Sequence, residues 1–157
     1  MLFKGCGINI VTPFTDTNEV DFDSLGRLVD TYINIGAKAL ILGRTTGEFF
    51  AMSDNEILEL VDFVVKRVNK KIPVLAQTGL NDTSRSVVLS IRARALGLDG
   101  LIIASPYYGQ GNELGLISHF KSIALAGGLP TYIDNDPART GFNLEPSLIA
   151  KLAEIPN

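Results

Sequence analysis

The stretch Leu96-Gly-Leu-Asp-Gly-Leu-Ile-Ile-Ala104 contains the two signals that decide the fold. Gly97 follows a segment with helical periodicity, and glycine is typical of the residue just after a helix because it adopts the left-handed conformation. Gly100–Ala104 is apolar and too short for a helix, which is typical of a buried strand. The same order recurs around Ile35-Gly-Ala-Lys-Ala39, so the chain repeats a helix-to-strand unit of about 30 residues.

Alternating apolar patterns extend this unit along the chain. Short apolar runs predict strands at Gly7–Val11, Ala39–Leu42, Val74–Ala76, Gly100–Ala104 and Thr131–Ile133. Apolar residues at helical spacing predict helices over Asp21–Ile35, from a cap at Ser53 through Val68, around Val87–Ala95 and Leu114–Ala124, and over Pro146–Ala153. Strands that alternate with helices predict a parallel sheet with right-handed crossovers.

Length and composition limit the class of protein. The 157 residues are enough for one domain, and 46% hydrophobic with 20% charged residues is typical of a folded globular chain. A net charge of −3 and the lack of a long apolar run predict no nucleic-acid and no membrane partner. A single cysteine excludes a disulfide scaffold and, with no recognisable signal peptide, predicts a cytoplasmic protein.

Continuous apolar strands indicate a sheet covered on both faces, and two architectures do this: an open doubly wound sheet and a (β/α)8 barrel. Length alone favours the open sheet, because a full barrel typically needs about 250 residues. In both architectures ligands bind beyond the C-terminal ends of the strands. The loops that follow the strands are therefore the places to look for functional residues.

The second strand is followed by Gly43-Arg-Thr-Thr-Gly-Glu48. The hydroxyls of Thr45 and Thr46 and the N–H groups of the turn suit a carboxylate or a phosphate. A structural turn whose hydroxyls satisfy its own backbone is an equally good interpretation. No Gly-Lys-[Ser/Thr] follows, which excludes a Walker A loop.

Polar loops also follow the fourth and fifth strands. In Ser105-Pro-Tyr-Tyr-Gly109 one tyrosine can pack while the other presents its hydroxyl to a pocket, although the pair by itself favours simple loop packing. In Asp134-Asn-Asp-Pro-Ala-Arg-Thr-Gly141, Arg139 suits either a substrate carboxylate or an ion pair with Asp134 or Asp136. The carboxylates of Asp134 and Asp136 are a weak signal for a divalent-cation site, and neither a metal nor a cofactor is expected.

Two reactive residue types lie outside these loops. His119 lies on the fourth predicted helix beside Phe120, where a helix-surface or packing role is expected. Cys6 precedes the first strand, with no histidine nearby in the sequence to activate it. It is expected to be a small buried residue.

Together the motifs identify a family resemblance from Phe3 to Asn157. The matching stretches include Val11-Thr-Pro-Phe14, Val20-Asp-Phe22, Thr45-Thr-Gly-Glu48, Gln77-Thr-Gly-Leu-Asn81, Ser105-Pro-Tyr-Tyr108, His119-Phe-Lys121, Pro137-Ala-Arg-Thr-Gly141 and Leu152-Ala-Glu-Ile-Pro156. They resemble the dihydrodipicolinate synthase and N-acetylneuraminate lyase family of pyruvate-dependent class I aldolases, and the retained Arg139 favours the dihydrodipicolinate synthase branch. The resemblance implies an α/β fold, an incomplete TIM barrel of about five βα units with parallel strands. Residues 1–157 would form a single domain, the N-terminal portion of a (β/α)8 barrel.

The resemblance also implies a reaction and a set of site residues. In the family, pyruvate forms a Schiff base with a lysine on the sixth barrel strand and condenses with aspartate semialdehyde in lysine biosynthesis. Thr46 would hold the pyruvate carboxylate, and Arg139 the carboxylate of the aldehyde. Thr45 and Tyr108 would relay protons, Tyr108 in the site of a neighbouring subunit. The implied partners are a pyruvate-like oxo-acid and other copies of the chain in a homo-oligomer.

Departures from the family pattern bear on activity. The Schiff-base lysine would lie a short way beyond Asn157, in the next strand. The family's catalytic tyrosine is here Asp134, and a carboxyl with a reference pKa of about 4 is charged at neutral pH and repels pyruvate. Arg44 replaces a glycine beside the pocket, where it would block the site or pair with Asp134. Phe49 and Phe50 replace the polar residues of lysine-inhibited members, so inhibition by lysine is not expected.

These departures predict that the chain alone is inactive and that the rest of the barrel comes from another chain or was lost by truncation. One alternative is a non-catalytic relative that binds a small oxo-acid or assembles as a self-associating half-barrel. Another is a stand-alone open α/β binding domain, which the lack of a glycine-rich phosphate loop disfavours. An unclosed barrel leaves strand edges and apolar faces uncovered, which predicts self-association.

Overall fold

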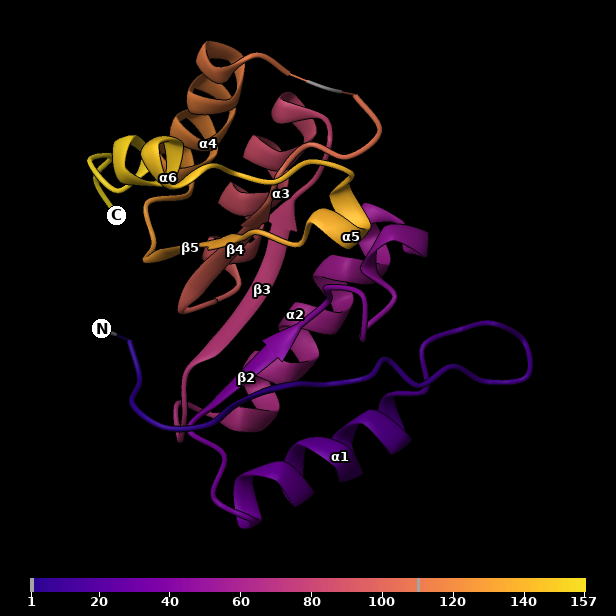
Figure 1. The fold of residues 1–157 in the computed structure, drawn as a ribbon. Helices are drawn as coiled ribbons and strands as arrows, with labels where there is room; N and C mark the ends of the chain where they lie inside the picture. The colour runs from indigo at the N-terminus through magenta and orange to yellow at the C-terminus, as the bar shows by residue number, and fades with distance from the viewer. Residues whose placement is uncertain (1, 110) are drawn as a thin grey trace. The chain divides into compact units, whose positions relative to one another are not determined.

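Five βα units follow one another in a computed structural model that describes residues 2–109 and 111–157 (Figure 1). The elements are β1 (Gly7–Asn9), α1 (Phe22–Asn34), β2 (Ala39–Leu42), the 3-10 helix η1 (Phe49–Ala51), α2 (Asp54–Val68), β3 (Val74–Gly79), α3 (Thr83–Ala95), β4 (Gly100–Ala104), α4 (Glu113–Gly127), β5 (Thr131–Asp134), α5 (Pro137–Thr140) and α6 (Pro146–Leu152). Within the described ranges, no helix combines the length and the apolar character needed to cross a membrane.

The strands form a parallel sheet in chain order, β1-β2-β3-β4-β5. β1 pairs with β2 with Gly7 opposite Ala39, and β2 pairs with β3 in the same parallel sense. β4 pairs with β5 from Leu101 opposite Thr131. β3 and β4 are buried along their whole length, as expected for central strands of a parallel sheet. The prediction of about five βα units with parallel strands is confirmed.

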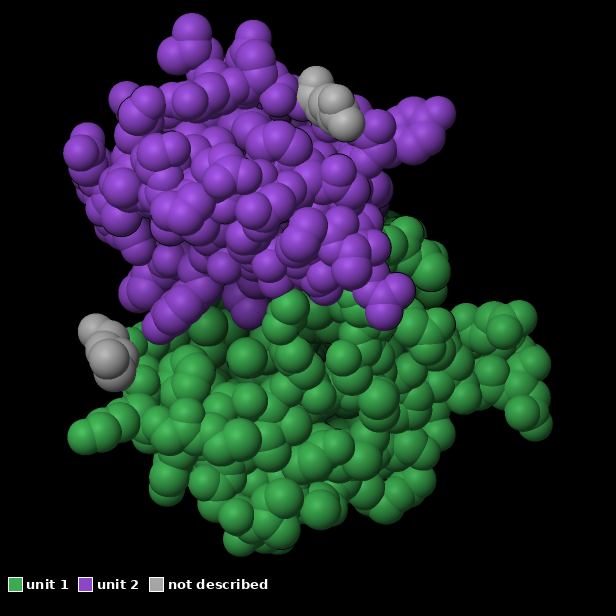
Figure 2. Space-filling view, in the orientation of Figure 1, with its two compact units in different colours: residues 1–77, 95–100 green, residues 78–94, 101–157 purple. Residues whose placement is uncertain are grey.

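Contacts within the chain concentrate in two compact units, which Figure 2 colours separately. Unit 1 comprises residues 1–77 and 95–100, and unit 2 comprises residues 78–94 and 101–157. Unit 1 contains β1, α1, β2, α2 and the first part of β3, whereas most of α3 and nearly everything from β4 onwards belong to unit 2. Each unit has its own core and its own share of the predicted site residues.

The apolar face of α2 forms much of the core of unit 1. This helix buries side chains at helical spacing, namely Ile57, Leu60, Val61, Val64 and Val68. It begins with the predicted capping box, in which Glu56 N donates to Ser53 Oγ (3.3 Å) and Ser53 N donates to Glu56 Oε2 (2.8 Å). The capping box fixes where the helix starts, directly after the loop that follows β2.

The core of unit 2 lies under α4 and α6. Its buried members are Ile103, Leu116, Phe120, Ile123, Leu144, Leu148 and Leu152. Partly buried apolar residues pack against this cluster, including Ile133 of β5 and Ile155 after α6. The cluster therefore joins the last strand of the sheet to the last helix of the chain.

β3 continues beyond its predicted end, to Gly79. Its polar residues Gln77 and Thr78 conceal the strand in the sequence, yet both are fully buried. The Ser90 hydroxyl donates to Thr78 Oγ1 (2.7 Å), which offsets the cost of burying that hydroxyl. A Cβ on Gly79 would lie 2.4 Å from Ile103 Cγ2, so the end of this strand requires glycine.

The start of the chain differs from the prediction in two respects. β1 ends at Asn9 rather than Val11. Val11 lies beyond the end of the strand and is 45% exposed. The prediction that Cys6 is buried is wrong, since it is exposed. It lies directly before β1, where its backbone oxygen accepts from Lys38 N (2.8 Å) while its side chain stays at the surface.

Candidate functional site

A tight turn follows β2 in unit 1 and leaves Thr45 and Thr46 exposed. Gly47 N donates to Gly43 O (3.0 Å), which closes the turn. A Cβ on Gly43 would lie 2.6 Å from Cδ2 of Phe49, and a Cβ on Gly47 would lie 2.7 Å from Gly43 O. Both glycines are therefore required, and the turn holds the two hydroxyls at the C-terminal end of a strand.

Neighbouring residues hold this turn in a strained conformation. Thr12 is buried, and its Oγ1 donates to Gly47 O (2.8 Å). Arg44 and Glu48 both have φ of +56°, a left-handed conformation that costs a non-glycine residue about 1–3 kcal/mol. The positive φ at position 44 explains why a glycine suits this place in the family pattern. Such strain persists only where the surrounding structure fixes the backbone, and it is typical of functional turns.

Two tyrosines follow β4 in unit 2 and lie in different environments. Tyr107 is half-buried, whereas Tyr108 is fully exposed and has φ of +73°. A bulky residue with positive φ is uncommon outside sites of strain or function. The two adjacent phenols are thus separated, one packed and one directed into solvent.

Asp134 is the last residue of β5, where it lies opposite Ala104 of β4. It is half-buried at the C-terminal end of the strand. The loop beyond it is fixed by Asn135, whose Oδ1 accepts from Leu144 N (3.0 Å) and whose Nδ2 donates to Asn143 Oδ1 (3.0 Å). A carboxyl group thus occupies the position at which the family pattern has a tyrosine.

Arg139 lies on the short helix α5 that follows this loop. The helix is anchored by the buried Thr140, whose Oγ1 lies 3.0 Å from both Asp136 O and Phe142 O. Arg139 is exposed, and it forms no ion pair within the two described ranges of the chain. The alternative in which Arg139 pairs with Asp134 or Asp136 is therefore wrong, because α5 presents the guanidinium to solvent.

A pocket of about 460 Å³ lies beside Tyr107 and Tyr108 in unit 2, and His119 lines it. His119 is only 4% exposed, and its Nδ1 lies 2.8 Å from Thr83 Oγ1. Burial lowers the pKa of His119, and the negative charge of Asp82 opposes this shift to a lesser extent. The predicted packing role is confirmed, and the helix-surface alternative is wrong because the ring points into the unit.

Two polar side chains to which the sequence analysis gave no role lie at strand ends. Asn9 ends β1 and Ser105 follows β4. Asn9 Oδ1 and Ser105 Oγ are buried, and neither has a hydrogen-bond partner in the described part of the chain. Buried polar atoms without a partner are rare and mark places for a ligand or a water molecule. The signal in the sequence was a polar residue within an apolar run for Asn9 and directly after one for Ser105.

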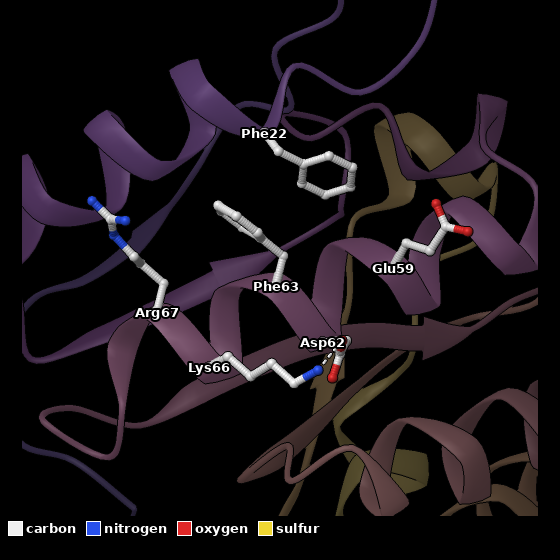
Figure 3. Close-up of a pocket in the computed structure, with 6 residues that line it drawn as sticks. All are labelled: Phe22, Glu59, Asp62, Phe63, Lys66 and Arg67. Carbon is white, nitrogen blue, oxygen red and sulfur yellow. Dashed lines mark hydrogen bonds and ion pairs between the residues drawn. The ribbon is translucent and has the colours of Figure 1, made fainter.

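A larger pocket, of about 640 Å³, lies between α1 and α2 of unit 1 (Figure 3). The rings of Phe22 and Phe63 pack at its centre, with their centroids 5.0 Å apart. The ammonium group of Lys66 forms an ion pair with Asp62 (2.6 Å) at its rim. This pocket lies on helices rather than at the C-terminal ends of strands, which disfavours it as the ligand site of such a fold.

Comparison with known proteins identifies the family. The sequence profile of the dihydrodipicolinate synthetase family matches residues 2–157. The chain belongs to this family. The 4-hydroxy-tetrahydrodipicolinate synthase of Caldicellulosiruptor bescii is 46% identical over 156 residues, which are 99% of this chain and 53% of that protein.

Solved structures of family members agree with this assignment. Dihydrodipicolinate synthase from Bacillus anthracis matches all of this chain and 54% of its own, with a TM-score of 0.95 and 34% identity. The chloride-inhibited enzyme from Acinetobacter baumannii, complexed with pyruvate, matches 98% of this chain and 53% of its own, with a TM-score of 0.95 and 37% identity. The chain thus spans about half the length of its relatives and corresponds to their N-terminal part. The prediction of an incomplete TIM barrel is confirmed.

Proposed function

We propose that the chain is the pyruvate-binding half of a 4-hydroxy-tetrahydrodipicolinate (dihydrodipicolinate) synthase, a class I aldolase that condenses pyruvate with aspartate semialdehyde. The observation that carries this proposal is the strained turn after β2, which exposes Thr45 and Thr46 at a strand end. Two hydroxyls and the N–H groups of a turn suit a carboxylate. The pyruvate complex of the Acinetobacter baumannii relative supports the same ligand class.

The remaining site residues take roles that their chemistry supports. Thr46 binds the pyruvate carboxylate, and Thr45 passes a proton along the site. The exposed guanidinium of Arg139 binds the carboxylate of the second substrate, because a guanidinium can donate two parallel hydrogen bonds to one carboxylate. The full exposure of Tyr108 supports a role at the site of a neighbouring subunit in a homo-oligomer.

The chain alone does not form the Schiff base on which this chemistry depends. Each of its lysines is exposed, namely Lys4, Lys38, Lys66, Lys70, Lys71, Lys121 and Lys151. A Schiff-base lysine needs a desolvated or cationic pocket that activates its amine, whereas an exposed side chain is not desolvated. The complete reaction therefore requires a lysine from the half of the barrel that this chain does not span.

Asp134 favours a second candidate function for the chain on its own, a non-catalytic protein that binds a small oxo-acid. A carboxylate is unable to donate a proton at neutral pH as a tyrosine does, and it repels an anionic substrate. In this alternative Thr46 still binds the carboxylate.

Pyruvate binding tests the role of the turn. We expect saturation-transfer NMR to detect pyruvate bound to the chain and Thr46→Val to weaken binding by about tenfold or more, because a hydrogen bond to a charged group contributes about 1.5–3 kcal/mol. Thr31→Val, which removes an exposed hydroxyl on α1, is the control and should bind pyruvate as the unmodified chain does. Equal affinity of all three proteins would refute the assignment of the turn.

Borohydride trapping tests the absence of Schiff-base chemistry. We expect intact-protein mass spectrometry after incubation with pyruvate and borohydride to show the unmodified mass. A reduced pyruvate adduct on one lysine would show that an alternative nucleophile exists, and the chain would then be able to start the aldolase reaction alone.

A further inference from the structure

Asn9, the last residue of β1, carries a buried side-chain oxygen for which the described part of the chain offers no hydrogen-bond partner. Leaving a buried acceptor unpaired costs stability, because the atom has lost its bonds to water and gained none in return. Folded proteins keep such atoms mainly where an ordered water or a ligand satisfies them. The Asn9 oxygen therefore needs a donor from a molecule that binds beside it.

The register of the sheet sets which residues share a face with Asn9. Asn9 lies opposite Ile41 of β2, and Ile41 lies opposite Leu75 of β3. Residues paired across neighbouring strands point to the same face, and so do alternate residues of one strand, which places Gln77 on this face as well. Gln77 is fully buried and, like Asn9, belongs to unit 1. Two carboxamide side chains thus share one face of the sheet within this unit.

The end of β1 is also close to the turn that presents Thr46. That turn starts two residues after Ile41, the strand partner of Asn9. Beyond Asn9 the chain reaches Thr12, whose Oγ1 donates to Gly47 O (2.8 Å) and ties the segment after β1 to the turn. Asn9 and Thr46 therefore lie at the same end of adjacent strands, which is the end at which ligands bind in such a fold.

From this juxtaposition we propose that Asn9 is a specificity-determining residue, which selects a small 2-oxo-acid that carries a hydroxyl group in preference to pyruvate. Thr46 binds the carboxylate, and the ligand hydroxyl donates to Asn9 Oδ1. A hydroxyl both donates and accepts, so it satisfies the carboxamide in either orientation of its oxygen and nitrogen. Pyruvate has no donor and leaves the buried oxygen unpaired. This selectivity rests on the proposed function, which supplies the carboxylate contact.

A set of matched oxo-acids tests the selectivity. 3-Hydroxypyruvate differs from pyruvate by a single hydroxyl, and 2-oxobutyrate has a methyl group in place of that hydroxyl. We expect saturation-transfer NMR titrations of the chain to show that 3-hydroxypyruvate binds about tenfold more tightly than either of the others, because a buried polar group disfavours an analogue that leaves it unpaired.

Variants of the chain assign the preference to one side chain. Asn9→Leu keeps the approximate size of the side chain and removes both of its polar atoms, so it should bind the three acids within about twofold of one another. Asn55→Leu, which removes an exposed carboxamide on α2, is the matched control and should keep the full preference. Asn9→Ala is a second variant at the site, and thermal unfolding shows whether each variant is folded.

The outcomes separate this selectivity from the proposed function. Thr46→Val should weaken the binding of all three acids alike. Equal affinity for the three acids in the unmodified chain would overturn the selectivity and show that water satisfies Asn9, while a loss of affinity in Thr46→Val would leave the proposed function intact. A preference that survives in both Asn9→Leu and Asn9→Ala would overturn the selectivity as well. No detectable binding of any of the acids would refute the selectivity and the proposed function together.

Discussion

A single buried hydrogen bond connects Thr12 with the candidate turn, from its Oγ1 to Gly47 O (2.8 Å). Thr12→Val keeps the shape of the side chain and leaves this carbonyl without its partner, at a cost of about 1–3 kcal/mol. We expect the free energy of unfolding to fall by that amount in urea titrations. Thr31→Val removes an exposed hydroxyl bonded to Arg27 O and should change the free energy by less than about 0.5 kcal/mol. Equal effects of the two substitutions would contradict an anchoring role for Thr12.

His119 gives the chain a stability change near neutral pH that can be assigned to one residue, because the sequence contains a single histidine. Burial lowers its folded pKa below the ordinary value of 6.5, so the unfolded chain binds the proton more readily. The contribution of His119 to the free energy of unfolding is therefore fully present above about pH 6.5, and it is lost as the pH falls toward the folded pKa.

The measurement is urea unfolding of the chain and of His119→Gln at pH about 7.5 and about 5.5. We expect the unmodified chain to lose stability between these values and the variant to show a flatter profile. An NMR titration of the ring reports the folded pKa directly, and a value above 6.5 would contradict the argument. The acidic groups with lowered pKa, including Asp30 beside Arg67 and Glu56 in the capping box, contribute only at lower pH.

At the scale of single elements, the start of α2 depends on its capping box. Ser53→Ala removes the acceptor of Glu56 N and should lower the free energy of unfolding by about 1 kcal/mol. Ser118→Ala, at an exposed position inside α4, is the control and should be neutral or slightly stabilising because alanine favours helix. Chemical denaturation measures both, and an equal loss in the two variants would argue against the cap.

Element boundaries were predictable where the signal is local. Gly36 and Gly97, predicted to end helices, have φ of +90° and +95°. Pro146 begins α6 as predicted, since its missing N–H is unneeded in the first turn. The end of β3 was missed because Gln77 and Thr78 are polar, and the partner that allows Thr78 to be buried, Ser90, lies on the following helix α3. The short helix α5 was missed because a single turn leaves no periodic pattern to detect.

At the scale of the whole molecule, apolar surface at the β5 edge predicts how the isolated chain behaves. An apolar groove of about 340 Å³ beside β5 is lined by Phe120, Ile133, Ile149 and Leu152, among others, so we expect the 157-residue chain to self-associate and to bind an apolar dye. Light scattering at several concentrations measures the mass, and Ile149→Lys should reduce both association and dye binding. A monomer that binds no dye at any concentration would contradict this expectation.

The sequence by itself determined the order of elements, the parallel sense of the strands, the family and the positions of the candidate site residues, because each depends on local patterns or on motifs read along the chain. Only the tertiary structure decided that Cys6 and Arg139 are exposed, that Asn9 and Ser105 bury polar atoms and that a groove opens beside β5. The physical reason is that burial and pairing depend on residues far apart in the sequence, which a local pattern does not contain.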